Sequence, residues 1–453
     1  MIPEITSENE RTRVLMVGYN GANNTGAEAL LQADIEDLRA VFGAGVHITV
    51  PTLNETNLRR YLHESATLTI APIPSLYFGA IRRLVKESDL VLLAEGSTYM
   101  DTWGSPLLWL FLWATHCATK MGKPSLAYAV DAGALSRANQ KRVRNIASST
   151  SLIVTRNRAA ADRLRGIGVT APIECTADNA FTFTPKLSDG GWLAREWPLA
   201  GRGVAGLAMV DFTLFPAVMR LWAPKVRCYR WPYYFSGSPQ RRRFSEKLAG
   251  VFAALADHIV ESTGKAVALI CMEQLDEAFA AHVQRRMRHP EHARQFSARN
   301  YDASQMTLLL RGLDLLVTSR YHAAVLSLAA GVPQVAIGHD TRLSTIYHDL
   351  GLRERWFMEP CAKGRADWEF FGTQFFTELR ERVDLLLNDP GLQKEKLDRG
   401  YSEHFERARR NRKLLSAFAA KQMAEFGVSG SKGAIAADVA IPPQENGGMK
   451  CAA

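Results

Sequence analysis

Short apolar segments alternate with longer amphipathic segments along the first part of the chain. The apolar stretches have the length and continuity of buried strands, and they lie at 14–18, 47–51, 89–94, 125–130 and 151–155. After a turn at 19–26, apolar residues return at helical spacing, at Ala27, Leu30, Leu31, Ile35 and Leu38. Because strands and helices alternate, the pattern predicts a doubly wound α/β domain with a parallel sheet.

The same alternation restarts after a break near 185–203, where proline and glycine residues crowd together. Further strands are predicted at 203–210, 267–272, 314–319 and 332–338. Long helices are predicted between them, notably over 241–263 and 275–288. The second half therefore reads as another α/β domain.

Together the two halves predict two doubly wound α/β domains that face one another. We assign residues 12–190 to the first domain and residues 203–395 to the second. A helix over 396–426 follows without another strand, and we expect it to cross back to the first domain. The remaining residues, 427–453, contain no aromatic side chain and are rich in Gly, Ala and Pro, which predicts a disordered tail.

The composition fits a globular protein and restricts its chemistry only weakly. Hydrophobic residues make up 47% of the 453 residues and charged residues 22%, which excludes a disordered or collagen-like chain. Lys and Arg number 55 against 46 Asp and Glu, and this charge of +9 fits nucleic acid, a phosphorylated small molecule or an anionic membrane surface. The six cysteines are widely separated, so no metal site is expected. A polar N-terminus and the lack of a long apolar run predict a cytoplasmic protein.

The first loop has the glycine spacing of a phosphate-binding loop without its cation. Gly21 and Gly26 are correctly spaced, but Ala and Glu stand where Lys and Ser or Thr are required, which excludes an ATPase. We interpret Gly21, Asn24 and Thr25 as a binding loop for an anion or a hydroxyl-rich ligand at the start of a helix. A tight turn without a ligand remains the alternative.

Acidic residues follow the strand at 89–94. In open α/β sheets ligands bind at the carboxyl ends of the strands, where Glu95 and Asp101 are expected. Asp101 is a candidate catalytic base for a sugar hydroxyl, and Glu95 a candidate to orient that hydroxyl. A helix cap is the alternative role for Asp101.

The segment 313–333 reads as a strand, a polar elbow and a helix of small residues. Arg320 and His322 stand at the start of that helix, where donor side chains favour a phosphate or a carboxylate. An arginine paired with a carboxylate and a histidine in the core are the alternative. The next strand leads to Asp340, a candidate base or orienting group, and to Arg342, a candidate ligand of a second acidic group.

Two basic runs, 241–243 and 407–413, are predicted to form solvated helix faces. They lack interleaved aromatic residues, so nucleic acid is not an expected partner. Peripheral contact with an anionic membrane surface is the alternative for these runs.

Five stretches, taken in their order along the chain, resemble the polysaccharide pyruvyl transferases. They are Val-Gly-Tyr-x-Gly-x-x-Asn-Thr-Gly-Ala-Glu-Ala at 17–29, Leu-Leu-Ala-Glu-Gly-Ser at 92–97, Val-Thr-Arg-Asn at 154–157, Ala-Asp-Asn-Ala-Phe at 177–181 and Ser-Arg-Tyr-His at 319–322. The resemblance implies a GT-B-like fold, in which two Rossmann-like domains face one another across a cleft. It also implies transfer of the pyruvyl group of phosphoenolpyruvate to sugar hydroxyls, which forms a ketal on a cell-surface glycan or its lipid-linked precursor.

By this resemblance, His322 and Arg320 match the histidine and the arginine of the family's motif. Phosphoenolpyruvate carries a phosphate and a carboxylate, so we expect Arg320, Arg342 and Arg156 to hold it. We expect His322 to act as general acid or phosphate ligand, with a carboxylate as the base. No cofactor is expected beyond the donor substrate.

Two other functions stay open at this stage. One is a GT-B glycosyltransferase that uses a nucleotide sugar, and the other is a non-catalytic relative that binds a glycan or a phosphorylated metabolite. Two positions differ from the family's pattern. Residues 95–97 read Glu-Gly-Ser where members typically carry a run of glycines, and 207–212 lack the arginine that usually follows the first strand of the second half.

Overall fold

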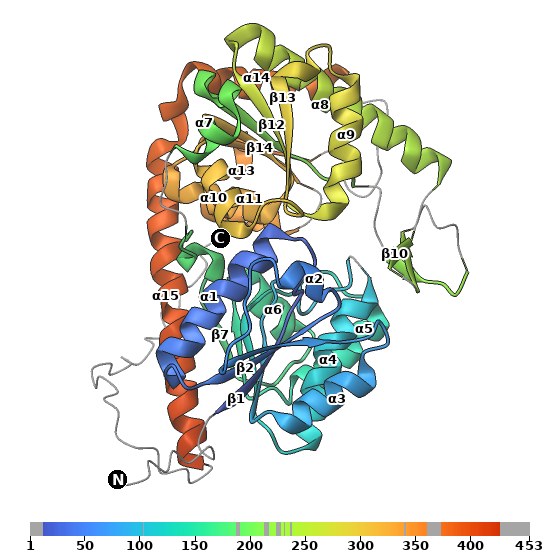
Figure 1. Cartoon of the computed structure of the whole chain (residues 1–453), viewed down its shortest axis with the longest axis vertical. Helices are drawn as coiled ribbons and strands as arrows, with labels where there is room; N and C mark the ends of the chain where they lie inside the picture. Colours follow the sequence, from blue (N-terminus) through green and yellow to red (C-terminus); the bar gives the residue numbers. More distant parts are fainter. Residues whose placement is uncertain are drawn as a thin grey trace, which may run out of the picture.

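The computed structural model describes residues 12–102, 104–186, 191–212, 217–222, 228–230, 232–235, 238–338, 341–359 and 373–425. Two α/β domains lie one above the other in Figure 1, and the long helix α15 (Lys394–Glu425) runs along one side of both. The two-domain α/β fold predicted from the sequence is confirmed. The predicted tail at 427–453 lies outside the described residues.

A parallel sheet of seven strands forms the core of the first domain, in the order β3-β2-β1-β4-β5-β6-β7. Its strands are β1 (Arg13–Val17), β2 (His47–Thr52), β3 (Leu68–Pro72), β4 (Leu90–Leu93), β5 (Ser125–Val130), β6 (Leu152–Thr155) and β7 (Ile173–Cys175). The helices around it are α1 (Thr25–Phe42), α2 (Glu55–Leu58), α3 (Phe78–Glu87), α4 (Ser105–Lys120), α5 (Arg137–Ala147) and α6 (Arg158–Gly166).

Helices cover both faces of this sheet, which explains the continuous apolar runs in the sequence. Successive side chains of β1 point to opposite faces. Val14 and Met16 pack in a cluster with residues of α1 and α15, whereas Leu15 and Val17 pack in a cluster with residues of α3, α4 and α5. A strand buried on both faces needs no polar positions.

The second domain repeats the design with six parallel strands, in the order β13-β12-β8-β14-β15-β16. The strands are β8 (Val204–Ala208), β12 (Ala266–Cys271), β13 (Ala293–Ser297), β14 (Leu315–Thr318), β15 (Gln334–Ile337) and β16 (Phe357–Met358). The helices of this half are α7 (Trp192–Glu196), α8 (Pro239–Thr263), α9 (Glu277–Arg286), α10 (Ala303–Arg311), α11 (Tyr321–Ser327), α12 (Thr341–Asp349), α13 (Arg353–Trp356) and α14 (Thr373–Asn388).

The strands of the two large sheets that the sequence pattern did not predict all lie at sheet edges. They are β3, β7, β13 and β16. β3 alternates buried and partly exposed residues, β7 is partly exposed throughout, and β16 has only two residues. An edge strand has one neighbour and is less covered, so it lacks the continuous apolar run by which the central strands were recognised.

Helix α15 joins the two domains, as the sequence predicted. Leu397 and Ala408 belong to the apolar core of the second domain, whereas Leu415 and Phe418 belong to a core cluster of the first. Polar contacts fix its second half, because Arg412 Nε lies 2.6 Å from Asp37 Oδ1 on α1. The relative position of the domains is therefore supported by a helix that packs on both.

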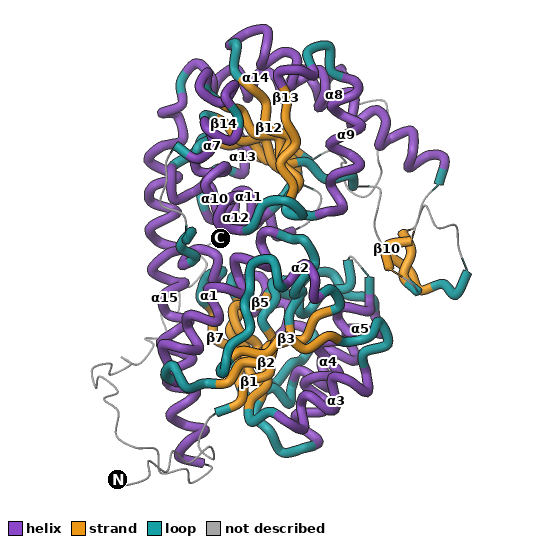
Figure 2. Tube along the Cα trace, in the orientation of Figure 1, coloured by secondary structure: helices purple, strands orange, loops and turns teal. Residues whose placement is uncertain are grey.

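A small antiparallel sheet stands apart from the two large ones (Figure 2). It consists of β9 (Ala217–Met219), β10 (Cys228–Arg230) and β11 (Tyr233–Phe235), in the order β10-β11-β9. Among the described helices, none is both long and apolar enough to cross a membrane.

Candidate active site

Carboxyl ends of strands from both sheets meet between the two domains. Glu95 follows β4, Arg156 follows β6 and Asp178 follows β7 in the first domain. Tyr321 and His322 follow β14 in the second domain, at the start of α11. Contacts between these side chains place them in one cluster, at the edge where open α/β sheets bind ligands.

The centre of the cluster is a buried arginine with two carboxylates. Arg156 Nε lies 2.9 Å from Asp131 Oδ2, and Arg156 Nη1 lies 2.6 Å from Asp178 Oδ2. The guanidinium also lies 4.2 Å from the centre of the Tyr321 ring, as a cation–π pair across the domain interface. Burial by itself would raise the pKa of Asp178, but Arg156 and His322 outweigh it and lower that pKa. Asp178 is therefore an anion in the folded protein.

His322 lies next to this anion and against the first turn of α1. Its Nε2 lies 3.6 Å from Asp178 Oδ2, and it has no hydrogen-bond partner among the described residues. A Cβ atom at Gly26 would overlap the imidazole ring, so a glycine is required at that position of α1. The ring is thus held between the domains, with Nε2 facing the Asp178 carboxylate.

Glu95 contributes a second unsatisfied polar atom to the cluster. Its Oε1 accepts a hydrogen bond from the Ser97 backbone N–H at 3.2 Å, whereas its Oε2 is buried without a partner in the described part of the chain. Burial raises the pKa of Glu95, and His322 and Arg156 only partly offset this. Buried polar atoms are nearly always hydrogen-bonded in folded proteins, so the unsatisfied Oε2 of Glu95 indicates a position where a further group can bind.

Arg342 brings a cation from the second domain to the same place. Its Nη1 lies 3.4 Å from Ser97 Oγ, and its charge also lowers the pKa of Glu95. The structure therefore brings together three residues that the sequence predicted, His322, Glu95 and Arg342. Asp340 lies outside the described residues.

Arg320 is held by two carboxylates of its own domain. Its Nη1 lies 3.1 Å from Glu273 Oε2, its Nε lies 3.0 Å from Asp276 Oδ2, and its Nη2 also pairs with Asp276. The Tyr19 hydroxyl of the first domain donates to Glu273 at 3.0 Å. In this conformation Arg320 supports a contact between the domains, which is the paired arginine that the sequence analysis gave as the alternative.

A profile of the polysaccharide pyruvyl transferases matches residues 24–341, which is more than half of the chain. This chain belongs to the polysaccharide pyruvyl transferase family. The resemblance in the sequence is thereby confirmed, and the protein is a transferase by family. A search of curated proteins gives no match.

Solved structures share the fold at low sequence identity. A putative UDP-N-acetylglucosamine 2-epimerase from Listeria monocytogenes is 14% identical over 91% of this chain and 97% of that chain, with a TM-score of 0.58. The UDP-GlcNAc 2-epimerase from Methanocaldococcus jannaschii is 11% identical over 90% of this chain and 99% of that chain, with a TM-score of 0.56. The one from Neisseria meningitidis, bound to UDP-GlcNAc, is 10% identical over 90% of this chain and all of that chain, with a TM-score of 0.55. These similarities establish a GT-B-like fold.

The first loop of this pyruvyl transferase family member joins the two domains. Gly21 has a φ of +73°, which fits the tight turn, and Asn24 Oδ1 accepts a hydrogen bond from Ala27 N at 3.0 Å as the cap of α1. The Thr25 N–H donates to Met272 O at 2.9 Å, and Asn23 Nδ2 donates to Gln274 Oε1 at 2.7 Å. Turn, cap and domain contact account for Gly21, Asn24 and the backbone of Thr25, so ligand binding by this loop stays a prediction.

Two other predicted site residues have structural partners. Asp101 accepts hydrogen bonds from Ser136 Oγ and from Asn139 Nδ2, each at 2.7 Å, at the start of α5. These contacts with α5 account for its carboxylate, whereas α4, the helix that follows Asp101, has Gly104 at its N-cap position and no side-chain cap, so the expected cap of the following helix is not formed. Arg156 was expected to hold the donor, but its side chain is fully buried by Asp131 and Asp178. In this structure its guanidinium is paired with these two carboxylates, and donor binding by Arg156 stays a prediction.

Asp131 and Asp178 are the residues of this site that the sequence analysis missed. Asp131 directly follows β5, so the rule that identified Glu95 after β4 applies to it equally. Asp178 lies within the stretch 177–181 that carries the family resemblance, but no role was assigned to it.

Proposed function

We propose that this protein transfers the pyruvyl group of phosphoenolpyruvate to hydroxyls of a glycan or of its lipid-linked precursor. The observation that carries the proposal is the His322–Asp178–Arg156 chain, together with the buried Glu95 carboxyl group, at the meeting point of the two domains. Membership of the family supports this donor and this class of acceptor.

The reaction needs one proton donor and one proton acceptor. The methylene carbon of phosphoenolpyruvate takes up a proton, and a sugar hydroxyl oxygen bonds to the adjacent carbon as the hydroxyl proton leaves. A second hydroxyl oxygen then bonds to the same carbon as the carbon–oxygen bond to phosphate breaks, and its proton leaves with the phosphate, which yields the ketal and inorganic phosphate. Histidine and a carboxyl group of raised pKa are suited to such transfers near neutral pH.

The cluster offers one group for each role. His322 Nε2 lies 3.6 Å from the Asp178 carboxylate, and we assign to His322 the proton that reaches the methylene carbon. Burial raises the pKa of Glu95, which makes this carboxylate a stronger base for the hydroxyl proton. Arg342 supplies a cation for the phosphate or the carboxylate of the donor.

The test is phosphate release from phosphoenolpyruvate in the presence of a panel of lipid-linked saccharides, with the ketal product followed by mass spectrometry. We expect release that depends on the acceptor, its loss in His322→Gln, and no loss in the control His289→Gln, which pairs with Glu261 away from the cluster. The absence of release with every acceptor, together with no binding of phosphoenolpyruvate by calorimetry, would contradict the proposal. Protection by a nucleotide sugar instead would favour a glycosyltransferase.

We also propose that the protein contacts the cytoplasmic face of an anionic membrane, where a lipid-linked acceptor lies. The small sheet supports this, because Leu221 and Trp222 are 58% and 86% exposed next to the exposed Arg220. Exposed aromatic and basic residues are typical of membrane interfaces. Sedimentation with vesicles that contain anionic lipid should decrease in Trp222→Ser, and equal binding to neutral vesicles would contradict the charge argument.

A further inference from the structure

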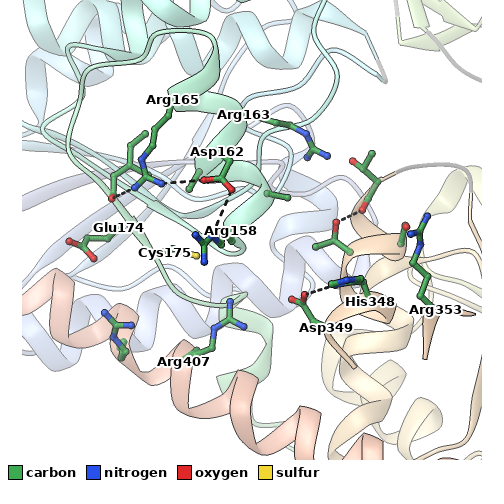
Figure 3. A pocket seen from close by; sticks show the side chains of 17 residues that line it. Arg158, Asp162, Arg163, Arg165, Glu174, Cys175, His348, Asp349, Arg353 and Arg407 are labelled. Atoms are coloured by element: carbon green, nitrogen blue, oxygen red, sulfur yellow. Dashed lines mark hydrogen bonds and ion pairs between the residues drawn. The ribbon is translucent and has the colours of Figure 1, made fainter. Parts of the chain in front are cut away.

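A large cavity lies beside the active site, between the two domains. Its volume is about 1030 Å³, and its walls come from α6 and β7 of the first domain, from α12 and α13 of the second, and from α15. Figure 3 shows Arg407 of α15 extending toward Arg158 of α6, with His348 and Asp349 of α12 on the other side. Pockets for organic ligands typically have volumes of roughly 300–1,000 Å³, so this one has room for more than a single small anion.

The lining carries a surplus of positive charge. Six arginines line the cavity, namely Arg158, Arg163, Arg165, Arg353, Arg407 and Arg410, against the three carboxylates Asp162, Glu174 and Asp349. The difference is three positive charges. Only three lining residues, Ala159, Ala161 and Ile173, have purely hydrocarbon side chains, so the cavity suits a polar ligand.

Several of these arginines are oriented by backbone oxygens, and one exposed carboxylate, Asp162, is shared by Arg165 at 3.5 Å and Arg158 at 3.8 Å. Arg163 Nη1 donates to Ala132 O at 2.8 Å, Arg165 Nη2 to Ile173 O at 3.1 Å, and Arg407 Nη2 to Thr176 O at 2.6 Å. A carbonyl oxygen fixes the direction of a guanidinium group but leaves its full charge in place. Arg410 makes no hydrogen bond or ion pair with the part of the chain that the structure describes.

The cavity and the active-site cluster are built from neighbouring residues. Arg158 lines the cavity two residues after Arg156, and Thr341 lines it next to Arg342. Cys175, on the cavity wall, precedes Asp178 by three residues. None of the cluster residues His322, Glu95 and Asp178 lines the cavity itself, so a ligand that reaches both places must extend beyond the cavity.

We propose that this cavity binds a diphosphate group that is part of the acceptor substrate, with the sugar that it carries directed to His322. This inference rests on the proposed function. Guanidinium groups match phosphate oxygens in pairs. A diphosphate diester carries two negative charges, which the surplus of three positive charges can compensate. The hydroxyls of Thr341, Ser344 and Thr345 add neutral hydrogen-bonding groups for oxygen atoms along α12.

The first experiment measures the binding of inorganic diphosphate to the full chain by calorimetry. We expect the double variant Arg158→Gln/Arg410→Gln to raise the Kd at least about tenfold, equivalent to 1.4 kcal/mol. The matched control is Arg409→Gln. Arg409 is next to Arg410 on α15, but it pairs with Glu406 and does not line the cavity, so this variant should change the Kd less than twofold. Equal weakening by the control, no binding to the wild-type protein, or equally tight binding of inorganic phosphate would overturn the proposal.

A second experiment separates this proposal from the proposed function. His322→Gln should abolish phosphate release from phosphoenolpyruvate but leave the Kd for diphosphate unchanged. The double variant should raise the KM of a diphosphate-linked acceptor at least about tenfold and leave the KM of phosphoenolpyruvate unchanged. Diphosphate binding without phosphate release would contradict only the proposed function, whereas release without a change in acceptor KM would contradict only the cavity proposal.

The diphosphate could belong to a lipid carrier or to a nucleotide, and competition distinguishes these sources. A polyprenyl diphosphate in detergent and uridine diphosphate are each titrated against bound inorganic diphosphate. If one of these compounds competes, and competes less well in the double variant, the cavity is supported as the site and that compound identifies the source of the diphosphate. Competition by neither compound would overturn the proposal.

Discussion

Arg156 and Arg158 are separated by one residue, yet their surroundings are electrostatically opposite. The side chain of Arg156 is fully buried and pairs with two buried carboxylates, Asp131 and Asp178, whereas the side chain of Arg158 is 90% exposed and pairs only at 3.8 Å with the exposed Asp162. A buried guanidinium requires compensating carboxylates, because an unpaired charge in the protein interior is costly. The active-site arginine therefore contributes to structure, and the cavity arginine is available to a ligand.

The same contrast holds for the two regions as a whole. Arg156 in the active-site cluster and Arg320 at the neighbouring domain contact each have two carboxylate partners. The cavity contains six arginines and three carboxylates. Compensated charges hold side chains in place for proton transfer, whereas uncompensated charges attract an anion.

Removal of the compensated arginine should have the largest effect. Arg156→Met leaves Asp131 and Asp178 buried without their cation, and we expect the free energy of unfolding to fall by about 3–5 kcal/mol. Urea denaturation measures this change. The control Arg158→Met should alter the same quantity by less than about 0.5 kcal/mol, because an exposed side chain away from tight packing contributes little. Similar values for the two variants would contradict the comparison.

Loss of the carboxylate next to His322 should impair turnover more than binding. In Asp178→Asn the His322 imidazole loses the carboxylate that lies 3.6 Å from its Nε2, so we expect the kcat of phosphoenolpyruvate-dependent phosphate release to fall on the order of 100-fold. The KM for phosphoenolpyruvate should stay within about twofold. The matched change in the cavity, Asp162→Asn, should leave kcat unaltered. A parallel loss of kcat in both variants would argue for a general effect of charge and not for a role of Asp178 at His322.

The sequence predicted the central strands well because their burial is complete. Residues of β1 and β4 are apolar at almost every position, and the pattern alone located them. The sequence pattern did not predict the edge strands β3 and β13. Each has a single neighbouring strand and is therefore less completely buried. Central strands carry the signal of both faces, and edge strands do not.

For the site, the sequence predicted where functional residues lie better than it predicted which residues they contact. His322, Glu95 and Arg342 were correctly expected at strand ends, and the structure brings them together. That Arg320 pairs with Glu273 and Asp276 could not be derived, because those carboxylates are more than forty residues away and are brought close only by the fold. An arginine in a sequence shows a charge, and only its neighbours in space show whether that charge is available.

Glu28 is a buried carboxylate whose charge Arg60 compensates only in part, which places it between the fully paired Arg156 and the cavity arginines. Burial raises its pKa to about 8, although Arg60 Nη2 lies 3.0 Å from its Oε1 and lowers the pKa in part. Its proton is therefore held more tightly in the folded chain than in the unfolded chain, where glutamate has a pKa near about 4.3. The stabilisation by this group is complete below the unfolded pKa and is lost as the pH rises through about 8.

Glu28→Gln keeps an uncharged side chain at every pH, so it removes this dependence. Relative to Glu28→Gln, the wild-type protein should lose at least about 1 kcal/mol of unfolding free energy between pH 5 and pH 9. Urea denaturation of both proteins at pH 5, 7 and 9 measures the difference. A constant difference across this range, or one of opposite sign, would show that Arg60 compensates Glu28 as fully as Arg156 compensates Asp178.

The smallest effect, and the one with the opposite sign, is expected in the cavity. The arginines there repel one another, so Arg410→Gln should raise the free energy of unfolding by about a few tenths of a kcal/mol at low salt. The gain should vanish near 1 M salt, where the screening length falls to about 3 Å. Arg409→Gln, which instead breaks the pair with Glu406, should give no gain at either salt concentration. A loss of stability in Arg410→Gln would mean that this guanidinium supports the fold, and the contrast between compensated and available arginines would then fail at α15.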